Sequence, residues 1–199
     1  MRAAAMALGF LLVCATPARA EWLIKPFAGL TFGGSTTFID NELAADSPNV
    51  SIGVGGQWLG DILGLDVDLG HSPGFFDTGN PNREHLVLSS RVTTLAGNIV
   101  IALPRRLAEY SLRPYFVGGA GLMQVRIVNS PTEELLNVSA NLGAISLGGG
   151  VTGFLTDRLG LGWELRHFRS VSGDAGQGLS IGPERLSFWR ANMALVVRY

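Results

Sequence analysis

The sequence contains almost no cysteine or lysine, and it has no apolar run long enough for a membrane-spanning helix. Cys14 is the only cysteine, and Lys25 is the only lysine. The longest apolar run extends from Ala3 to Ala15, which is shorter than the roughly 20 residues that a transmembrane helix requires. These absences argue against a helical membrane span, and they exclude an internal disulfide and a cysteine metal site.

The apolar run has the features of a secretory signal peptide. Arg2 precedes it, and Ala18-Arg19-Ala20 follows as a cleavage site with a small residue at each end. We expect cleavage before Glu21, so that residues 1–20 form the signal peptide and residues 21–199 form one domain. An uncleaved N-terminal anchor is the alternative. Loss of Arg2 and Arg19 would reduce the 15 basic residues to 13, against 16 acidic ones, and this balance indicates no nucleic-acid partner.

From Trp22 onward, apolar and polar residues alternate, and clusters of Gly, Pro, Asn, Asp and Ser interrupt the alternation. A period of two is typical of β-strands, and no long stretch shows the helical period. We therefore predict an all-β domain of eight antiparallel strands. They cover Trp22–Gly33, Val50–Leu59, Ile62–Ser72, His85–Leu103, Leu112–Val128, Ala140–Leu155, Arg158–Phe168 and Leu186–Tyr199.

The predicted connections alternate in length along the chain. Residues 34–49, 73–84, 129–139 and 169–185 form long connections, 60–61 and 156–157 form very short ones, and 104–111 is intermediate. Outer-membrane β-barrels have long extracellular loops and short periplasmic turns. All seven lengths fit this arrangement if both chain ends are periplasmic, whereas a soluble sandwich has no reason to alternate. By length, Ser35–Asn49 and Ser170–Arg185 are the expected contact surfaces.

Two strands indicate which face is apolar. In Arg158–His167, leucine and tryptophan occupy one face, while arginine, glycine and glutamate occupy the other; Leu63–Gly70 repeats the pattern. The apolar face would be the core of a soluble protein, but in a membrane barrel it contacts lipid and the charges point into the lumen. Glycine and alanine accompany the charges, as a crowded interior requires, and lysine is nearly absent. We therefore favour an eight-stranded, up-and-down transmembrane β-barrel.

The same rule assigns the strand at 112–128 and the aromatic residues. We expect Tyr115, Val117, Met123, Val125 and Ile127 to face lipid, and Gly118, Ala120, Gln124 and Arg126 to face the lumen. Aromatic girdles flank the lipid-facing band of such barrels. The predicted girdles consist of Trp22, Trp58, Tyr115 and Tyr199 near the periplasmic end and of Phe32 and Trp189 near the extracellular end.

The charges assigned to the lumen are balanced. Strand parity places three acids and three bases inside, namely Asp66, Asp68, Glu164, Arg126, Arg166 and Arg190. Lys25 and Arg198 are expected lower, near the periplasmic mouth, and Glu164 is expected to reach Arg190 on the next strand. An eight-stranded barrel holds side chains and little else, and an unpaired buried charge is costly. We predict a salt-bridged plug, with a narrow or gated ion path as the alternative.

Other chemistries have weaker support in the sequence. Three histidines (His71, His85 and His167) are expected at the extracellular rim, but they lack a complete metal-ligand set. In His167-Phe-Arg-Ser170, the histidine and serine point to opposite faces of a strand, which disfavours a lipid A-modifying enzyme with a histidine-activated serine. Gly56-Gln-Trp58 is similar to the lipocalin start, but lipocalins have apolar interiors. We expect no catalytic residue, metal or cofactor.

Several segments resemble a known family. They are Arg113–Gly121, Leu147–Gly160, Glu164–Phe168 and the terminal Asn192-Met-Ala194-Leu-Val-Val197-Arg-Tyr199. These segments are similar to the OmpA-like superfamily of small outer-membrane β-barrels, specifically to its "outer membrane protein beta-barrel domain" proteins. The terminal strand resembles their assembly signal, formed here by Asn192, Ala194, Val197 and Tyr199, with Ala194 where the family usually has glycine. The resemblance implies an outer-membrane barrel but says little about activity.

The sequence thus predicts a non-enzymatic integral barrel in the outer membrane of a Gram-negative-type bacterium, with both chain ends in the periplasm. Its activity is expected in the four extracellular loops, with envelope integrity, adhesion or surface recognition as roles. A narrow porin-like channel is the first alternative, and a lipid A-modifying enzyme is the second. The expected partners are outer-membrane lipid, lipopolysaccharide and, during insertion, the barrel-assembly machinery; the surface ligand is left open.

Overall fold

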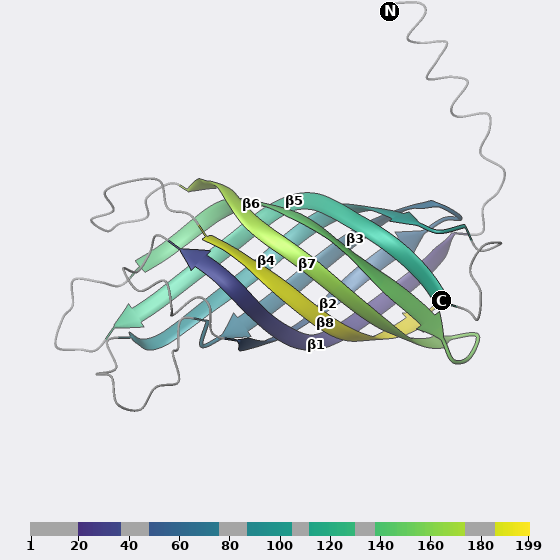
Figure 1. Ribbon diagram of the computed structural model, residues 1–199, viewed down its shortest axis with the longest axis horizontal. Coiled ribbons are helices and arrows are strands. Elements are labelled where there is room, and N and C mark those ends of the chain that lie inside the picture. Colours follow the sequence, from purple (N-terminus) through teal and green to yellow (C-terminus); the bar gives the residue numbers. More distant parts are fainter. Residues whose placement is uncertain (1–19, 37–47, 76–86, 105–111, 130–137, 174–185) are drawn as a thin grey trace, which may run out of the picture.

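A computed structural model describes residues 20–36, 48–75, 87–104, 112–129, 138–173 and 186–199 of the protein (Figure 1). Most of the predicted signal peptide, His85 and most of both expected contact surfaces lie outside these residues. The elements are the strands β1 (Glu21–Thr36), β2 (Asn49–Leu59), β3 (Leu63–Pro73), β4 (Val87–Ala102), β5 (Leu112–Asn129), β6 (Val138–Phe154), β7 (Leu159–Gly173) and β8 (Leu186–Arg198).

The eight strands form one closed antiparallel barrel, because β1 pairs with β8 as well as with β2. Each strand otherwise pairs with its neighbours in the sequence, so the topology is up-and-down. The strands run obliquely around the barrel, and β1 begins at the same end as the C-terminus (Figure 1). We call this the terminus end and the opposite one the loop end. No helix in the described part of the chain is long and apolar enough to cross a membrane.

Tight turns close the terminus end. In the β2–β3 turn, the Gly60 amide donates to the Leu63 carbonyl oxygen at 2.9 Å. In the β6–β7 turn, the Thr156 amide donates to the Leu159 carbonyl oxygen at 3.1 Å, and the Thr156 hydroxyl accepts the Leu159 amide at 3.0 Å. Both turns lie where the sequence predicts the very short connections. Hairpins this tight bring their strands together in antiparallel order.

The outer wall of the barrel is apolar. The outward positions of β3 illustrate this, since Leu63, Leu65, Val67 and Leu69 are between 45% and 61% exposed. Large exposed apolar residues also occur on each of the remaining strands. A soluble monomer does not leave a continuous apolar surface of this extent in water, whereas a transmembrane barrel presents such a band to lipid.

The eight-stranded fold and most strand positions agree with the sequence predictions. The largest boundary difference is at β7, which continues to Gly173 rather than ending at Phe168. Ser170, expected in a loop, therefore lies in the strand, and its hydroxyl accepts the Leu186 amide at 2.9 Å. Ser35 and Asn49, expected in the first loop, likewise belong to β1 and β2.

The predicted faces of β5 are wrong. Tyr115, Val117, Met123 and Val125 are buried in the lumen, and Gln124 and Arg126 point outward with Leu122. One physical reason is that apolar side chains of β5 also fill the lumen; the other is the length of the strand. About 9–11 residues span the hydrocarbon region, whereas β5 has 18. Beyond the apolar band, outward residues are polar, so an assignment based on polarity inverts the two faces.

Candidate functional site

The centre of the lumen contains a layer of ionised side chains. We call it the charge layer: Lys25, Asp66, Asp68, Glu164, Arg166 and Arg190. Its three basic and three acidic residues come from β1, β3, β7 and β8. Arg166 and Arg190 are each only 1% exposed. Buried charges require partners, and the strand positions supply them across the lumen.

Two neighbouring carboxylates on β3 hold this layer together. The Asp66 carboxylate lies 2.9 Å from Nζ of Lys25 on β1 and 3.4 Å from Nη2 of Arg166 on β7. It also accepts the Asn98 side-chain amide at 3.0 Å. The Asp68 carboxylate pairs with Arg190 on β8. The ion pairs connect β3 to β1, β7 and β8, none of which is adjacent to β3 in the sheet.

The Arg190 guanidinium lies between two aromatic rings. It is 4.8 Å from the ring centre of Phe27 and 4.7 Å from that of Phe168. Gly70 provides the space, because a Cβ there would lie 2.1 Å from Nη1 of Arg190. The aromatic faces and the Asp68 carboxylate therefore fix the position of this cation, with favourable cation–π geometry.

Glu164 pairs with a different arginine from the expected one. Its carboxylate lies 2.7 Å from Nη2 of Arg166 on the same strand and accepts the Tyr115 hydroxyl at 2.9 Å. The expected Glu164–Arg190 pair is wrong, because Asp68 binds Arg190. Lys25 was expected near the periplasmic mouth, but it belongs to the charge layer. Arg126, which was expected in the lumen, points outward, and Lys25 is instead the third basic residue that balances the three acids.

Two apolar clusters enclose the charge layer. The cluster toward the loop end contains Phe75, Val92, Ala96, Met123, Val125, Ala140, Leu142, Ala144, Phe168, Leu186 and Phe188. The cluster toward the terminus end contains Leu23, Leu59, Val100, Ala102, Tyr115, Val117 and Val196, with Phe154 packed against it. The sequence prediction of a polar interior was incomplete, because the lumen is apolar, then charged, then apolar along its axis.

Little space remains between these side chains. A cavity of about 20 Å³ lies beside Lys25, Tyr115 and Glu164, which is roughly the volume needed for one water molecule. Several buried polar atoms, including Nε and Nη1 of Arg166, have no hydrogen-bond partner among the described residues. A single water in this cavity is the most that the described interior accommodates there.

Two arginines stabilise the terminus end. The Arg113 guanidinium donates to the carbonyl oxygens of Gly60, Asp61 and Leu103 at 2.7 to 3.0 Å. The Arg198 guanidinium lies 2.8 Å from the Glu21 carboxylate and 4.1 Å from the ring centre of Phe154. These contacts join the β2–β3 turn to β5 and join the two terminal strands. No pattern in the sequence indicates this role for Arg113.

The residues of the C-terminal motif that resembles the assembly signal lie on β8 or directly after it. Asn192 is buried in the lumen, while Tyr199 is 81% exposed. The Tyr199 amide donates to the Trp22 carbonyl oxygen at 2.9 Å. Ala194 pairs with Phe27 on β1, and Val197 pairs with Ile24. The terminal segment therefore forms one side of the β1–β8 seam that closes the barrel.

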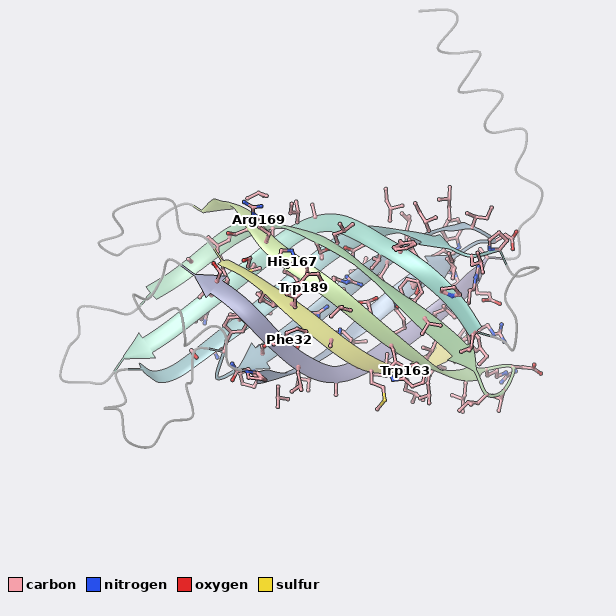
Figure 2. The ribbon with its side chains drawn as sticks, in the orientation of Figure 1. Phe32, Trp163, His167, Arg169 and Trp189 are labelled. Atoms are coloured by element: carbon pink, nitrogen blue, oxygen red, sulfur yellow. The ribbon has the colours of Figure 1, made fainter. Side chains whose placement is uncertain are left out.

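The outward residues of the predicted girdles lie at two levels of the wall. Trp22 and Trp58 are cross-strand partners at the terminus end, and Phe32, Trp189 and His167 follow one row near the loop end. Figure 2 shows His167, Trp189 and Phe32 beside one another, with Arg169 beyond them on β7. Tyr115 does not belong to either level, because it is buried; the expected girdle role is wrong for this residue. Phe116, its outward neighbour, is 74% exposed.

The histidines and serines considered above do not form a shared site. His71 Nδ1 lies 2.9 Å from Oγ1 of Thr93, and the His167 ring lies 4.8 Å from the Trp189 ring. Ser72 and Ser170 are buried in the lumen, on the opposite face from the adjacent histidines. In the described part of the chain, no three His, Cys, Asp or Glu residues are grouped to hold a metal ion.

Comparison with known proteins gives structural likeness only. No family model and no curated protein matches the sequence. Neisserial surface protein A (NspA) is 11% identical, with a TM-score of 0.58, and the match covers 90% of this chain and 99% of that one. The N-terminal β-barrel domain of Pseudomonas aeruginosa OprF is 14% identical, with a TM-score of 0.53 and coverages of 90% and 97%.

A third similar structure is Ail, the attachment invasion locus protein of Yersinia pestis, in complex with the heparin analogue sucrose octasulfate. It is 10% identical, with a TM-score of 0.50, and the match covers 89% of this chain and 97% of that one. At these identities the likeness concerns the fold. The closed barrel, its apolar outer wall and these likenesses together show that the chain has the fold of the small, eight-stranded, OmpA-like β-barrels of the Gram-negative outer membrane.

Proposed function

We propose that this protein is a non-conducting, non-enzymatic outer-membrane barrel whose activity resides in the connections at its loop end. The observation that carries the proposal is the layered lumen, in which an apolar cluster lies on each side of a charge-balanced layer. Ions crossing this interior would lose their hydration among apolar side chains, at a high free-energy cost. With the lumen closed, the connections at the loop end are where we expect the activity.

Surface recognition or adhesion is the role that we favour for these connections. Ail, which shares the fold, is an attachment invasion locus protein, and its structure was solved in complex with the heparin analogue sucrose octasulfate. The barrel in such a protein holds loops at a membrane surface, and loops on a rigid scaffold often carry the binding function. The predicted contact surfaces, Ser35–Asn49 and Ser170–Arg185, are the segments to test. Envelope integrity is a second role, and it requires no separate ligand.

A planar-bilayer recording tests the closed lumen. We expect the refolded domain to show no steady conductance, because the charge layer and both apolar clusters block the axis. Folding is verified on the same sample by resistance of the folded band to unfolding during electrophoresis without heating. A steady current that rises with salt concentration would contradict the proposal and would favour the narrow ion path.

The narrow ion path is the second candidate function. It is favoured by the small cavity and by the Arg166 nitrogens that have no hydrogen-bond partner among the described residues. They lie at the level where a permeating ion or water would need polar contacts. An intermittent current sensitive to substitution of Arg166 would identify a gated path through the charge layer. Complete silence in the recording would support the non-conducting lumen.

We further propose that the terminus end faces the periplasm and that the β8 terminus serves as the signal read by the barrel-assembly machinery. The short turns at this end and the exposed Tyr199 support both statements. Because predicted cleavage removes Cys14, one introduced thiol per variant can report orientation. Ser35→Cys marks the loop end and Asp157→Cys the terminus end, and both positions are exposed.

With a membrane-impermeant maleimide, we expect labelling of Ser35→Cys on intact cells and labelling of Asp157→Cys only after lysis. The reverse pattern would invert the orientation. In the Ser35→Cys background, deletion of Tyr199 is expected to reduce surface labelling several-fold, since it removes the last residue of the motif. Undiminished labelling after this deletion would refute the assembly role while leaving the orientation result valid.

A further inference from the structure

Charge on the outward face of the strands is confined to one end of the barrel and to one sign. The outward-pointing charged residues of the described strands are Arg91, Arg126 and Arg169, and none is acidic. All three lie toward the loop end of β4, β5 and β7. The remaining outward positions below them are mainly apolar. This distribution of positive charge indicates that the loop end of the barrel contacts an anionic surface.

Two of these arginines are direct neighbours. Arg91 on β4 and Arg126 on β5 are cross-strand partners, and both are exposed. Like charges in directly opposite positions destabilise a sheet. No carboxylate of the described residues pairs with either guanidinium. An anion bound between them would remove the repulsion and use both sets of donors.

The row beneath the arginines is polar and held in place. Thr93 and Gln124 are the next outward cross-strand partners. His71 Nδ1 lies 2.9 Å from Oγ1 of Thr93, and the Gln124 side-chain amide donates to Asn141 at 3.2 Å. We call Arg91, Thr93, Gln124 and Arg126 the arginine patch.

The lipid-facing wall begins directly below the arginine patch. Leu95 and Leu122 form the following outward row, and they are 47% and 61% exposed. The patch therefore lies at the boundary between acyl chains and headgroups. A ligand at this boundary would place an anionic group on the arginines and its chains against the leucines.

We propose that the arginine patch binds the phosphate monoester of an acylated sugar, the type of headgroup that lipid A carries. Guanidinium groups bind phosphate through paired hydrogen bonds. A monoester carries about −1.5 to −2 charges at neutral pH, which matches two arginines better than the single charge of a phosphodiester. The polar row offers a hydroxyl and an amide beside the phosphate. The biological setting of this site rests on the orientation proposed above.

Arg169 provides the matched control. It is also outward, exposed and near the loop end, but its cross-strand partner on β8 is Ser187 and not another arginine. Arg169→Gln removes the same charge as Arg91→Gln or Arg126→Gln. If diffuse electrostatic attraction held the lipid, all three substitutions would lower its affinity equally. If the paired site holds it, only Arg91→Gln and Arg126→Gln will lower the affinity.

The experiment measures lipid binding to the full mature domain in detergent micelles by native mass spectrometry. The probes are diphosphoryl lipid A, its dephosphorylated form with the same acyl chains, and phosphatidylglycerol. We expect Arg91→Gln and Arg126→Gln each to lower lipid A affinity about tenfold, the range of one lost charge-assisted contact. The double variant should be little weaker than either single variant, and Arg169→Gln should stay within about twofold of wild type.

Several outcomes would overturn the proposal. Among the variants, these are equal losses of lipid A affinity in all three single variants, or no loss in either patch variant. Among the probes, they are binding of dephosphorylated lipid A or phosphatidylglycerol as tight as that of lipid A, or displacement of lipid A by millimolar inorganic phosphate, which would indicate a site for free anions only. The assay contains no membrane with two sides, so its failure is independent of the labelling result on orientation.

A thermal-unfolding measurement separates binding from folding. The patch variants should be as stable as wild type, or more stable, without lipid A, because one like charge is gone. Added lipid A should raise the unfolding temperature of wild type and of Arg169→Gln but not of the patch variants. Equal stabilisation of all variants by lipid A would overturn the site.

Discussion

Asp66→Asn should lower the free energy of unfolding by about 3 to 5 kcal/mol, the range observed when one partner of a buried ion pair is removed. The Asp66 carboxylate contacts Lys25 and Arg166, which are both buried. An asparagine preserves the shape of the side chain but leaves one cation too many in the charge layer. Urea unfolding in micelles, followed by tryptophan fluorescence, measures the difference.

Two variants determine whether charge is the cause. Asp157→Asn makes the same chemical change in an exposed turn and should alter stability by less than about 0.5 kcal/mol. Combining Asp66→Asn with Lys25→Met restores the balance of the charge layer, so part of the lost stability should return. If the double variant lost the full sum of the two single effects on the free energy of unfolding, charge balance would not be what Asp66 provides.

Gly70→Ala should cost about 3 kcal/mol, combining overpacking with the loss of a fixed ion pair. The added Cβ would lie 2.1 Å from Nη1 of Arg190 and 2.9 Å from Oγ1 of Thr94. The guanidinium cannot easily move aside, because Phe27, Phe168 and Asp68 surround it. The same urea titration measures this loss.

Gly56→Ala is the matched control, since Gly56 points outward and a Cβ there meets nothing within 4 Å. This variant should be close to wild type. In an Arg190→Met background, Gly70→Ala should lose most of its effect, because the group that it displaces is absent. Equal costs for Gly56→Ala and Gly70→Ala would mean that the position of Arg190 does not limit stability.

The strand count, the turns and the barrel class could be predicted from the sequence because period-two alternation and connection length are local signals. The strand containing Leu63–Gly70 was assigned correctly because its outward face is uniformly apolar and its inward face carries only Gly and Asp. β5 was assigned incorrectly because apolar residues occur on both of its faces. Tyr115 and Val117 fill the lumen, whereas Phe116 and Leu122 face lipid.

The pairing within the charge layer could not be predicted for a different reason. Neighbouring strands suggested Glu164 and Arg190, but the lumen is narrow enough for side chains to reach across it. Asp68 on β3 thus binds Arg190 on β8, although the two strands are not adjacent in the sheet. Such contacts depend on barrel closure and rotamer, which alternation does not encode.

The position of the two β3 carboxylates has a consequence for the order of folding. Asp66 and Asp68 obtain their cations from β1, β7 and β8, and the β1–β8 seam joins the two ends of the chain. An open sheet of β1 to β6 would leave Asp68 without Arg190. Partly assembled sheets therefore carry uncompensated charge, and each is penalised in a low-dielectric membrane. Closure and charge neutralisation become a single cooperative step, in which the last strand to arrive completes both.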